Sequence, residues 1–202
     1  MAIQSRFLFK ERAESGALGL RSVALGDPED DQVLVKIHSA SICGTDLHIF
    51  KWNDWAARTY RPPIRLGHEF GGTVTAVGPD VKAIKLGEHV TAETHIACGH
   101  CHQCRLNRRH TCENLQLFSR IGLGCFSDYT MVPAAALRVV SGDIPLDHLT
   151  AMEPLGIAVR AVTEAGVAGA HVLILGCGPI GLFAIAAAKA YGASSITATD
   201  LS

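Results

Sequence analysis

The sequence has few aromatic and few charged residues for its length, and its hydrophobic residues are plentiful. Aromatic side chains make up 6% of the 202 residues and charged side chains 18%, whereas hydrophobic side chains make up 48%. A chain with this hydrophobic content can bury a core, which excludes disorder as its main state. The low aromatic content beside 20 glycines indicates many tight backbone turns.

The chain also has no excess of charge of either sign. It has 18 lysines and arginines against 19 aspartates and glutamates, so its formal net charge is −1. Nucleic acids and acidic membrane surfaces attract strongly basic proteins. The charge balance therefore argues against both as the main partner.

Segments that direct a chain to or through a membrane are not found. Residues 1–12 contain no apolar core of a signal peptide. Residues 165–188 carry no Asp, Glu, Lys or Arg, but His171, Pro179 and five glycines interrupt them, which predicts a buried strand and helix. We therefore expect a cytoplasmic protein, in which cysteines more often bind metal or catalyse than form disulfides.

The first 150 residues are predicted to be rich in β-strands. The alternation of Val33, Val35 and Ile37 predicts a half-buried strand, residues 71–79 a strand that ends in a turn, and residues 86–90 a turn into another strand. Short strands separated by glycine and proline are typical of a small barrel or sandwich.

The remaining residues, 151–202, have a different pattern. Residues 171–175 form a compact apolar run, which predicts a strand buried on both faces. Residues 180–191 are rich in alanine and predict a helix that ends at Gly192, and residues 195–199 predict a second strand. We place the domain boundary near residue 150.

Four cysteines within about twenty residues predict a metal-binding lobe at residues 95–115. Cys98, Cys101, Cys104 and Cys112 have the spacing C-x2-C-x2-C-x7-C. Four thiolates can surround a tetrahedral zinc and leave no open position, which is typical of a structural site. An iron–sulfur cluster and disulfides are the alternatives, although the seven-residue gap and the absence of proline after Cys112 favour zinc.

A second group of candidate ligands lies in two short motifs about twenty residues apart. The first motif contains Cys43, Thr45 and His48, and the second contains His68 and Glu69. Cysteine, histidine and glutamate are all zinc ligands, and a site with three protein ligands leaves room for a substrate oxygen. Each residue alone is weak evidence, because a single histidine is more often a core or surface residue.

A glycine-rich turn between a predicted strand and a predicted helix indicates a dinucleotide. The turn has Gly176, Gly178 and Gly181 in a G-x-G-x-x-G pattern, with Pro179 and Ile180 at the start of the helix. Glycine there allows a tight turn and a close approach of pyrophosphate, which the helix N-terminus attracts. Asp200, at the end of the next strand, is placed to bind ribose hydroxyls, and its charge favours NAD over NADP.

In this order, the motifs resemble those of the zinc-dependent medium-chain alcohol dehydrogenases, and the resemblance covers about residues 30–202. It implies an α/β plus β fold: a GroES-like β-barrel catalytic domain over residues 1–150, then the first β-α-β unit of an incomplete Rossmann domain over 151–202. Well over a hundred further residues would complete that domain. We therefore expect the isolated chain to bind NAD weakly, to oxidise little and to aggregate or oligomerise.

The same resemblance assigns roles to individual residues. It implies that Cys43 and His68 hold a catalytic zinc, with Glu69 as a direct or water-mediated ligand and Glu153 as a further carboxylate ligand. Thr45 and His48 are implied to relay the substrate proton towards solvent. No second cysteine matches the usual Cys₂His set, and a carboxylate in its place makes zinc a harder Lewis acid.

Within the family, residues 48–56 and 93–96 resemble the L-threonine 3-dehydrogenase branch. This implies oxidation of a secondary alcohol with hydride transfer to NAD, and a homotetramer in the full-length enzyme. Trp52, Trp55 and His95 are candidates for the substrate-pocket wall. The alternatives are a sorbitol-type polyol dehydrogenase, or a non-catalytic zinc-binding module whose basic lobe carries Arg105, Arg108 and Arg109.

Overall fold

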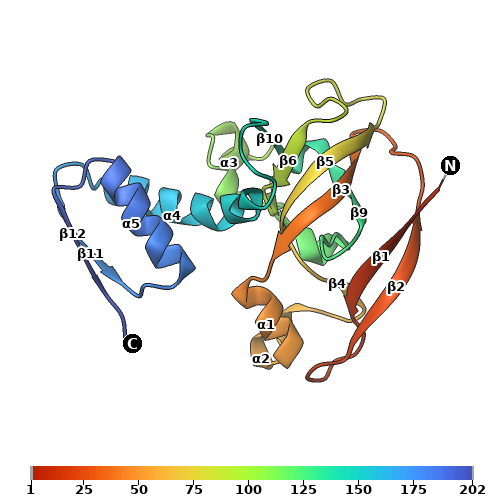
Figure 1. Cartoon of the computed structure of the whole chain (residues 1–202), viewed down its shortest axis with the longest axis horizontal. Helices are drawn as coiled ribbons and strands as arrows, with labels where there is room; N and C mark the ends of the chain where they lie inside the picture. The colour runs from red at the N-terminus through yellow and green to blue at the C-terminus, as the bar shows by residue number, and fades with distance from the viewer. Residues whose placement is uncertain (1, 202) are drawn as a thin grey trace. The chain divides into compact units, whose positions relative to one another are not determined.

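The computed structural model describes residues 2–201, which fold into two compact units. Unit 1 spans Met1–Thr150 and unit 2 spans Ala151–Ser202 (Figure 1). Unit 1 carries most of the strands, and unit 2 is a small layer of two strands and two helices.

Unit 1 is built from antiparallel strands. They are β1 (Ile3–Lys10), β2 (Leu18–Leu25), β3 (Gln32–Ser41), β4 (Ile64–Arg65), β5 (Glu69–Val77), β6 (His89–Ala92), β7 (His95–Ile96), β8 (Gln116–Leu117), β9 (Tyr129–Pro133) and β10 (Leu137–Val140). One sheet has the order β10-β6-β5-β3-β9, a second has the order β2-β1-β4, and β7 pairs with β8.

Strand β3, which lies between β5 and β9, is buried on both faces at its start, so the predicted half-buried alternation was wrong at Leu34. Val33 and Val35 are 0% exposed and pack in the core of the five-stranded sheet. Leu34 is 4% exposed and packs on the opposite side with Phe7 and Phe9 of β1. The alternation fails because the sheet that contains β1 covers the face of β3 that the prediction left exposed to solvent.

Short helices connect the strands of unit 1. They are α1 (Gly44–Lys51), α2 (Asp54–Thr59) and α3 (His102–Arg105), with 3₁₀ turns at Arg109–Thr111, Phe118–Ile121, Ala134–Ala136 and His148–Ala151. A small core holds α1 and α2 against β4, and its buried members are Ile49, Ala56, Tyr60, Ile64 and Leu66.

A buried lysine fastens the β1–β2 loop to the end of α1. The Lys10 side chain is 0% exposed, and its Nζ donates to the carbonyl oxygens of Glu14, of Gly16 at 2.8 Å and of Phe50 at 2.9 Å. Burial lowers the pKa of Lys10. All three ammonium hydrogens have acceptors, which satisfies the buried charge without a carboxylate hydrogen bond.

Unit 2 contains the parallel strands β11 (His171–Leu175) and β12 (Ser195–Thr199) and the helices α4 (Met152–Ala165) and α5 (Pro179–Ala190). Val172 and Ile196 pack against the helices. Leu173 and Leu175, on the other face of β11, are 60% and 78% exposed. Helices cover only one face of β11 within this unit, so the predicted burial on both faces is not seen in the described residues.

None of the helices in the described residues is both long enough and apolar enough to cross a bilayer. The charge-free stretch at residues 165–188 is divided between β11, the glycine turn and α5.

Candidate active site

Three side chains meet in unit 1, one from the residue before α1 and two from the start of β5. Cys43 precedes α1, His68 precedes β5, and Glu69 is the first residue of β5. One potential ligand atom from each lies within 4.8 Å of the others. His68 is 8% and Glu69 6% exposed, so the sulfur, nitrogen and oxygen donors converge in a largely dehydrated place.

A glycine turn presents His68. Gly67 has a φ of +83°, and a Cβ there would lie 2.5 Å from Cδ1 of Phe126. The Gly67 amide donates to Oδ1 of Asp46 at 3.3 Å, and its carbonyl accepts from the Cys125 amide at 3.1 Å. Both the amide and the carbonyl of Gly67 are thus held by hydrogen bonds, one residue before His68.

Asp46 supports two of the candidate ligands from behind, and the sequence motifs did not reveal this role. Its Oδ2 accepts from the Cys43 amide at 3.0 Å and lies 3.9 Å from Nδ1 of His68. Burial raises the pKa of the Asp46 carboxyl, while His68 and the amide donors act in the opposite direction. A carboxylate against one ring nitrogen of a histidine is the usual support for a metal ligand.

Glu69 and the neighbouring Cys125 are also held in place. Ser41 Oγ donates to Oε2 of Glu69 at 2.5 Å, and the other carboxylate oxygen can serve a metal. Cys125 is 0% exposed, its Sγ donates to the Glu69 carbonyl at 3.6 Å, and burial raises its pKa well above the usual value. Its thiol is therefore protonated, and sequence spacing gave no signal of its position.

A cavity of about 210 Å³ opens beside these groups. His68 lines it together with Thr45, Trp55 and His95, which were singled out from the sequence, and the remaining lining residues are Tyr60, Thr94, Leu117, Phe118 and Ser119. Trp52 is not among the lining residues; its ring lies 5.4 Å from Nζ of Lys10. A hydroxyl and an imidazole therefore share a small cavity with a candidate ligand.

His48 lies on α1 with a fixed partner. Its Nδ1 is 2.7 Å from Nδ2 of Asn53, and its ring centroid is 5.6 Å from that of Trp55. Asn53 is the N-cap of α2, and its Oδ1 accepts from the Ala56 amide at 3.0 Å. Because the amide oxygen is used by the cap, the NH₂ group faces His48 and donates to Nδ1. The sequence motif contained His48 but not this partner.

Glu153 is the one predicted ligand outside unit 1. It lies in the first turn of α4, in unit 2. Cys43, His68 and Glu69 therefore form the cluster that unit 1 supplies by itself.

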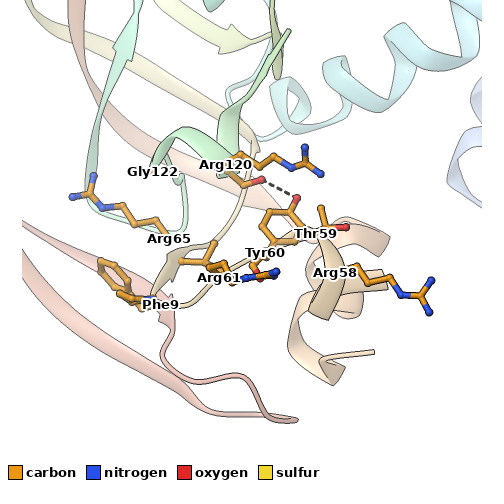
Figure 2. Close-up of a pocket in the computed structure, with 11 residues that line it drawn as sticks. Phe9, Arg58, Thr59, Tyr60, Arg61, Arg65, Arg120 and Gly122 are labelled. Carbon is orange, nitrogen blue, oxygen red and sulfur yellow. Dashed lines mark hydrogen bonds between the residues drawn. The ribbon is translucent and has the colours of Figure 1, made fainter. Parts of the chain in front are cut away.

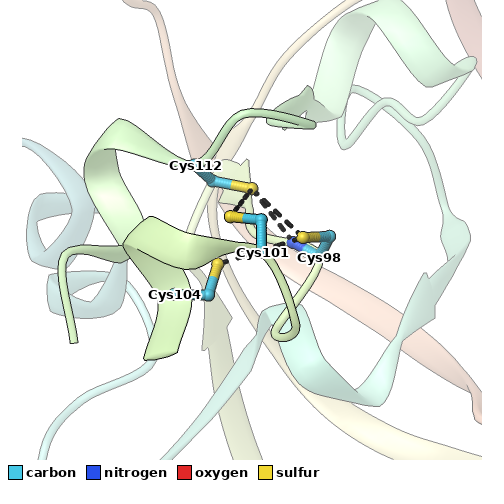
Figure 3. A group of neighbouring side chains, drawn as sticks. All are labelled: Cys98, Cys101, Cys104 and Cys112. Carbon is cyan, nitrogen blue, oxygen red and sulfur yellow. Dashed lines mark hydrogen bonds between the residues drawn. The ribbon is translucent and has the colours of Figure 1, made fainter. Parts of the chain in front are cut away.

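The four cysteines of residues 98–112 form a second cluster (Figure 3). Their sulfurs are separated by 3.5 Å for Cys98 and Cys112, 3.9 Å for Cys101 and Cys112, and 4.0 Å for Cys98 and Cys104. A tetrahedral zinc with Zn–S bonds of about 2.3 Å separates its sulfurs by about 3.8 Å. The spacing fits one such ion, whereas an iron–sulfur cluster needs room for several irons and sulfides.

The cysteines carry no disulfide, and backbone groups already face their sulfurs. All seven cysteines, each within the described residues, are free thiols. Amides of His100 and Cys101 lower the pKa of Cys98 to about 6, whereas loss of hydration raises the pKa of Cys104 to about 12. Without a cation, the four cysteines are therefore a mixture of thiols and thiolates. A bound cation would stabilise all four as thiolates.

The glycine turn of unit 2 joins β11 to α5. Gly176 has a φ of +100°, and a Cβ on Gly181 would lie 1.9 Å from the Gly176 carbonyl oxygen. A Cβ on Gly178, the N-cap of α5, would meet nothing within 4 Å. Two glycines are thus required by the turn itself, and the third leaves open space at the helix N-terminus, where a phosphate can approach the amides.

Asp200 lies at the end of β12 and binds this turn. Its Oδ2 accepts from the Cys177 amide at 2.6 Å, and its Oδ1 accepts from the Leu201 amide at 2.6 Å. The carboxylate is therefore at the mouth of the glycine turn, which is where an acidic residue meets the ribose of a dinucleotide.

Comparison with known proteins places these features in a family. Residues 29–142 match the alcohol dehydrogenase GroES-like domain. The chain is 44% identical over 193 residues to L-threonine 3-dehydrogenase of Pyrococcus furiosus, covering 96% of this chain but 55% of that protein. It therefore spans about half the length of this relative.

Two solved structures share the fold. Galactitol-1-phosphate dehydrogenase of Escherichia coli is 30% identical with a TM-score of 0.83, covering 98% of this chain and 56% of that one. A structure from Sinorhizobium meliloti 1021, solved with NADP bound, is 32% identical with a TM-score of 0.86, covering 97% of this chain and 56% of that one.

Proposed function

This chain belongs to the zinc-dependent medium-chain alcohol dehydrogenase family, and from that premise we propose that it takes part in oxidising a secondary alcohol with hydride transfer to NAD. The observation that carries the proposal is the cluster of Cys43, His68 and Glu69, whose ligand atoms lie within 4.8 Å of one another. His68 also lines the cavity that contains Thr45. One member of the metal-binding set and the Thr45 residue therefore line the same cavity.

The donor set fits a catalytic zinc, held by Cys43, His68 and Glu69. When bound, zinc acts as a Lewis acid that lowers the pKa of a substrate hydroxyl. Asp46 orients His68, and Ser41 holds one oxygen of Glu69.

Thr45 is proposed to receive the substrate proton. It lies in the first turn of α1 and lines the same cavity as His68. His48, one helical turn further along α1, carries the proton onwards to solvent. Trp55 and His95 form part of the wall that shapes the substrate space.

The cofactor proposed is NAD, bound by Gly176, Gly178, Gly181 and the N-terminal amides of α5. Asp200 supports NAD over NADP, because its carboxylate would repel a 2′-phosphate at the ribose. On this proposal unit 1 is a GroES-like barrel, and β11, α5 and β12 are the first β-α-β unit of a Rossmann domain.

The substrate proposed is L-threonine, because the 44% identical relative is named for that reaction and spans 96% of this chain. The four-cysteine lobe is proposed to hold a second, structural zinc, since its sulfurs are spaced for a tetrahedral ion. Both ions then belong to unit 1.

Zinc content separates the catalytic proposal from a simple zinc-binding module. We expect two zinc ions per purified chain by elemental analysis, one after Cys43→Ser and one after Cys101→Ser. The two variants should differ in stability, because only the lobe zinc organises its own segment. A single zinc that is lost in Cys101→Ser and kept in Cys43→Ser contradicts the catalytic site.

The reaction itself is tested with L-threonine and with sorbitol, each with NAD and with NADP. We expect NADH formation with threonine, at a low rate because the isolated chain is expected to bind NAD weakly, and its loss in Glu69→Gln. Formation with sorbitol alone assigns the chain to polyols. Equal rates in wild type and Glu69→Gln contradict the proposed site.

A further inference from the structure

A groove lined by arginines lies on unit 1, next to the candidate active site. Its volume is about 640 Å³, within the range of about 300–1,000 Å³ typical of small-molecule sites (Figure 2). Four arginines line it: Arg58, Arg61, Arg65 and Arg120. The other lining residues are Phe9, Thr59, Tyr60, Pro63, Ile64, Ser119 and Gly122. No carboxylate and no lysine is among the lining residues.

These arginines have no acidic partner within the described residues. Arg58, Arg65 and Arg120 make no ion pair there, and the Arg61 guanidinium donates to the carbonyls of Ala57 at 2.8 Å and Tyr60 at 2.7 Å. Their positive charges therefore add up around the groove. In Figure 2, Arg58 and Arg120 extend on one side of Tyr60 and Arg65 on the other.

Arg65 is the most constrained of the four. Its guanidinium carbon lies 4.6 Å from the ring centroid of Phe7 and 5.9 Å from that of Phe9. Burial lowers its pKa, and no carboxylate compensates the lost hydration. Stacking on aromatic rings compensates only part of the hydration that the Arg65 guanidinium loses. An anion bound in the groove would compensate more of it by pairing with this charge.

We propose that this groove binds a small organic phosphate, with the organic part against Tyr60 and Ile64 and the arginine side chains, which extend in different directions in Figure 2, turning towards the phosphate group. Several guanidinium groups match a phosphate better than a carboxylate, because a phosphate offers more oxygens and about twice the charge. The exclusive use of arginine agrees with this, since its planar fork binds phosphate in pairs of hydrogen bonds.

The groove is separate from the cavity that contains His68, but the two share part of their walls. Tyr60 and Ser119 line both this groove and the cavity that contains His68, and their hydroxyl oxygens are 3.1 Å apart. Arg120 also lies over the Tyr60 ring, 5.8 Å from its centroid. An anion that draws Arg120 into the groove therefore acts directly on the wall of the neighbouring cavity.

Arginine modification tests the site residue by residue, with inorganic pyrophosphate as the probe. The whole chain is treated with phenylglyoxal with and without 5 mM pyrophosphate, and each arginine is followed by peptide mass spectrometry. We expect modification of Arg58 and Arg120 to slow at least threefold, and that of Arg105 and Arg108 in the cysteine lobe to stay unchanged. Pyrophosphate at the glycine turn of unit 2 does not affect this readout, because that turn has no arginine.

A pair of matched variants gives the second measurement. In calorimetric titrations with pyrophosphate, Arg58→Gln/Arg120→Gln should lose the groove component of binding, at least a tenfold weakening. Arg105→Gln/Arg108→Gln removes the same charge from another exposed surface and should change it less than twofold. Equal protection of all arginines, equal weakening in both variants, or the same protection by malonate overturns the phosphate site. Because pyrophosphate also binds zinc, the zinc content of the chain is measured before and after each titration, and only samples with unchanged zinc are compared.

Discussion

Substitution of Gly67 by alanine measures how strongly the turn before His68 is constrained. Two costs add. An L-residue at a φ of +83° costs about 1–2 kcal/mol, and a Cβ that lies 2.5 Å from the Phe126 ring costs about 1–3 kcal/mol more if the ring shifts. We expect Gly67→Ala to lower the free energy of unfolding of unit 1 by about 2–5 kcal/mol. Urea unfolding followed by tryptophan fluorescence reports this unit, because Trp52 and Trp55 both lie in it.

Gly87 provides the matched control. Its φ of +82° is nearly the same, but a Cβ there meets nothing within 4 Å. Gly87→Ala should therefore cost only the backbone contribution of about 1–2 kcal/mol. If the two variants are equally stable, the clash with Phe126 contributes nothing, and the reasoning about the tightness of this turn is refuted.

Three further predictions concern other parts of the chain. Asn53→Asp keeps the helix cap but turns the donor facing His48 into an acceptor; we expect the ring proton to move from Nε2 to Nδ1, seen in long-range ¹H–¹⁵N spectra, with a stability change under about 0.5 kcal/mol. An unchanged tautomer contradicts the assignment. Arg6 lowers the pKa of Asp128 to about 2, so Asp128→Asn should destabilise by about 0.5–1 kcal/mol at pH 7, because the pair is largely exposed. This difference is present above pH 4 and is lost as the pH falls towards 2, which urea unfolding at pH 7 and pH 3 detects; a constant difference counts against the ion pair. Cys104→Ser should remove about one zinc per chain and lower the melting temperature, and an unchanged zinc content argues against the four-thiolate site.

The sequence motifs were sufficient to predict the family. Spacing alone indicated the four-cysteine lobe, because ligands close in sequence need little tertiary information to meet. The helix predicted at residues 180–191 is present as α5, Pro179–Ala190, because alanine-rich composition and a final glycine are local signals.

What the sequence could not predict depends on contacts between distant segments. Asp46 supports His68 from 22 positions earlier, and Cys125 lies against Glu69 although 56 residues separate them. The arginine groove combines Phe9 with Arg120, which no local pattern connects. Leu34 was misread for the same reason, since the sheet that covers it includes β1.

The buried Lys10 has a consequence for the order in which unit 1 opens. Its three carbonyl partners come from a loop and from the end of α1, and the Gly16 amide also donates to the Phe50 carbonyl at 2.9 Å. Detachment of α1 therefore removes two hydrogen bonds that the Phe50 carbonyl accepts, one from Lys10 and one from the Gly16 amide. Native-state hydrogen exchange should give the Gly16 amide and the last turn of α1 the same opening free energy, so that two segments distant in sequence behave as one cooperative element.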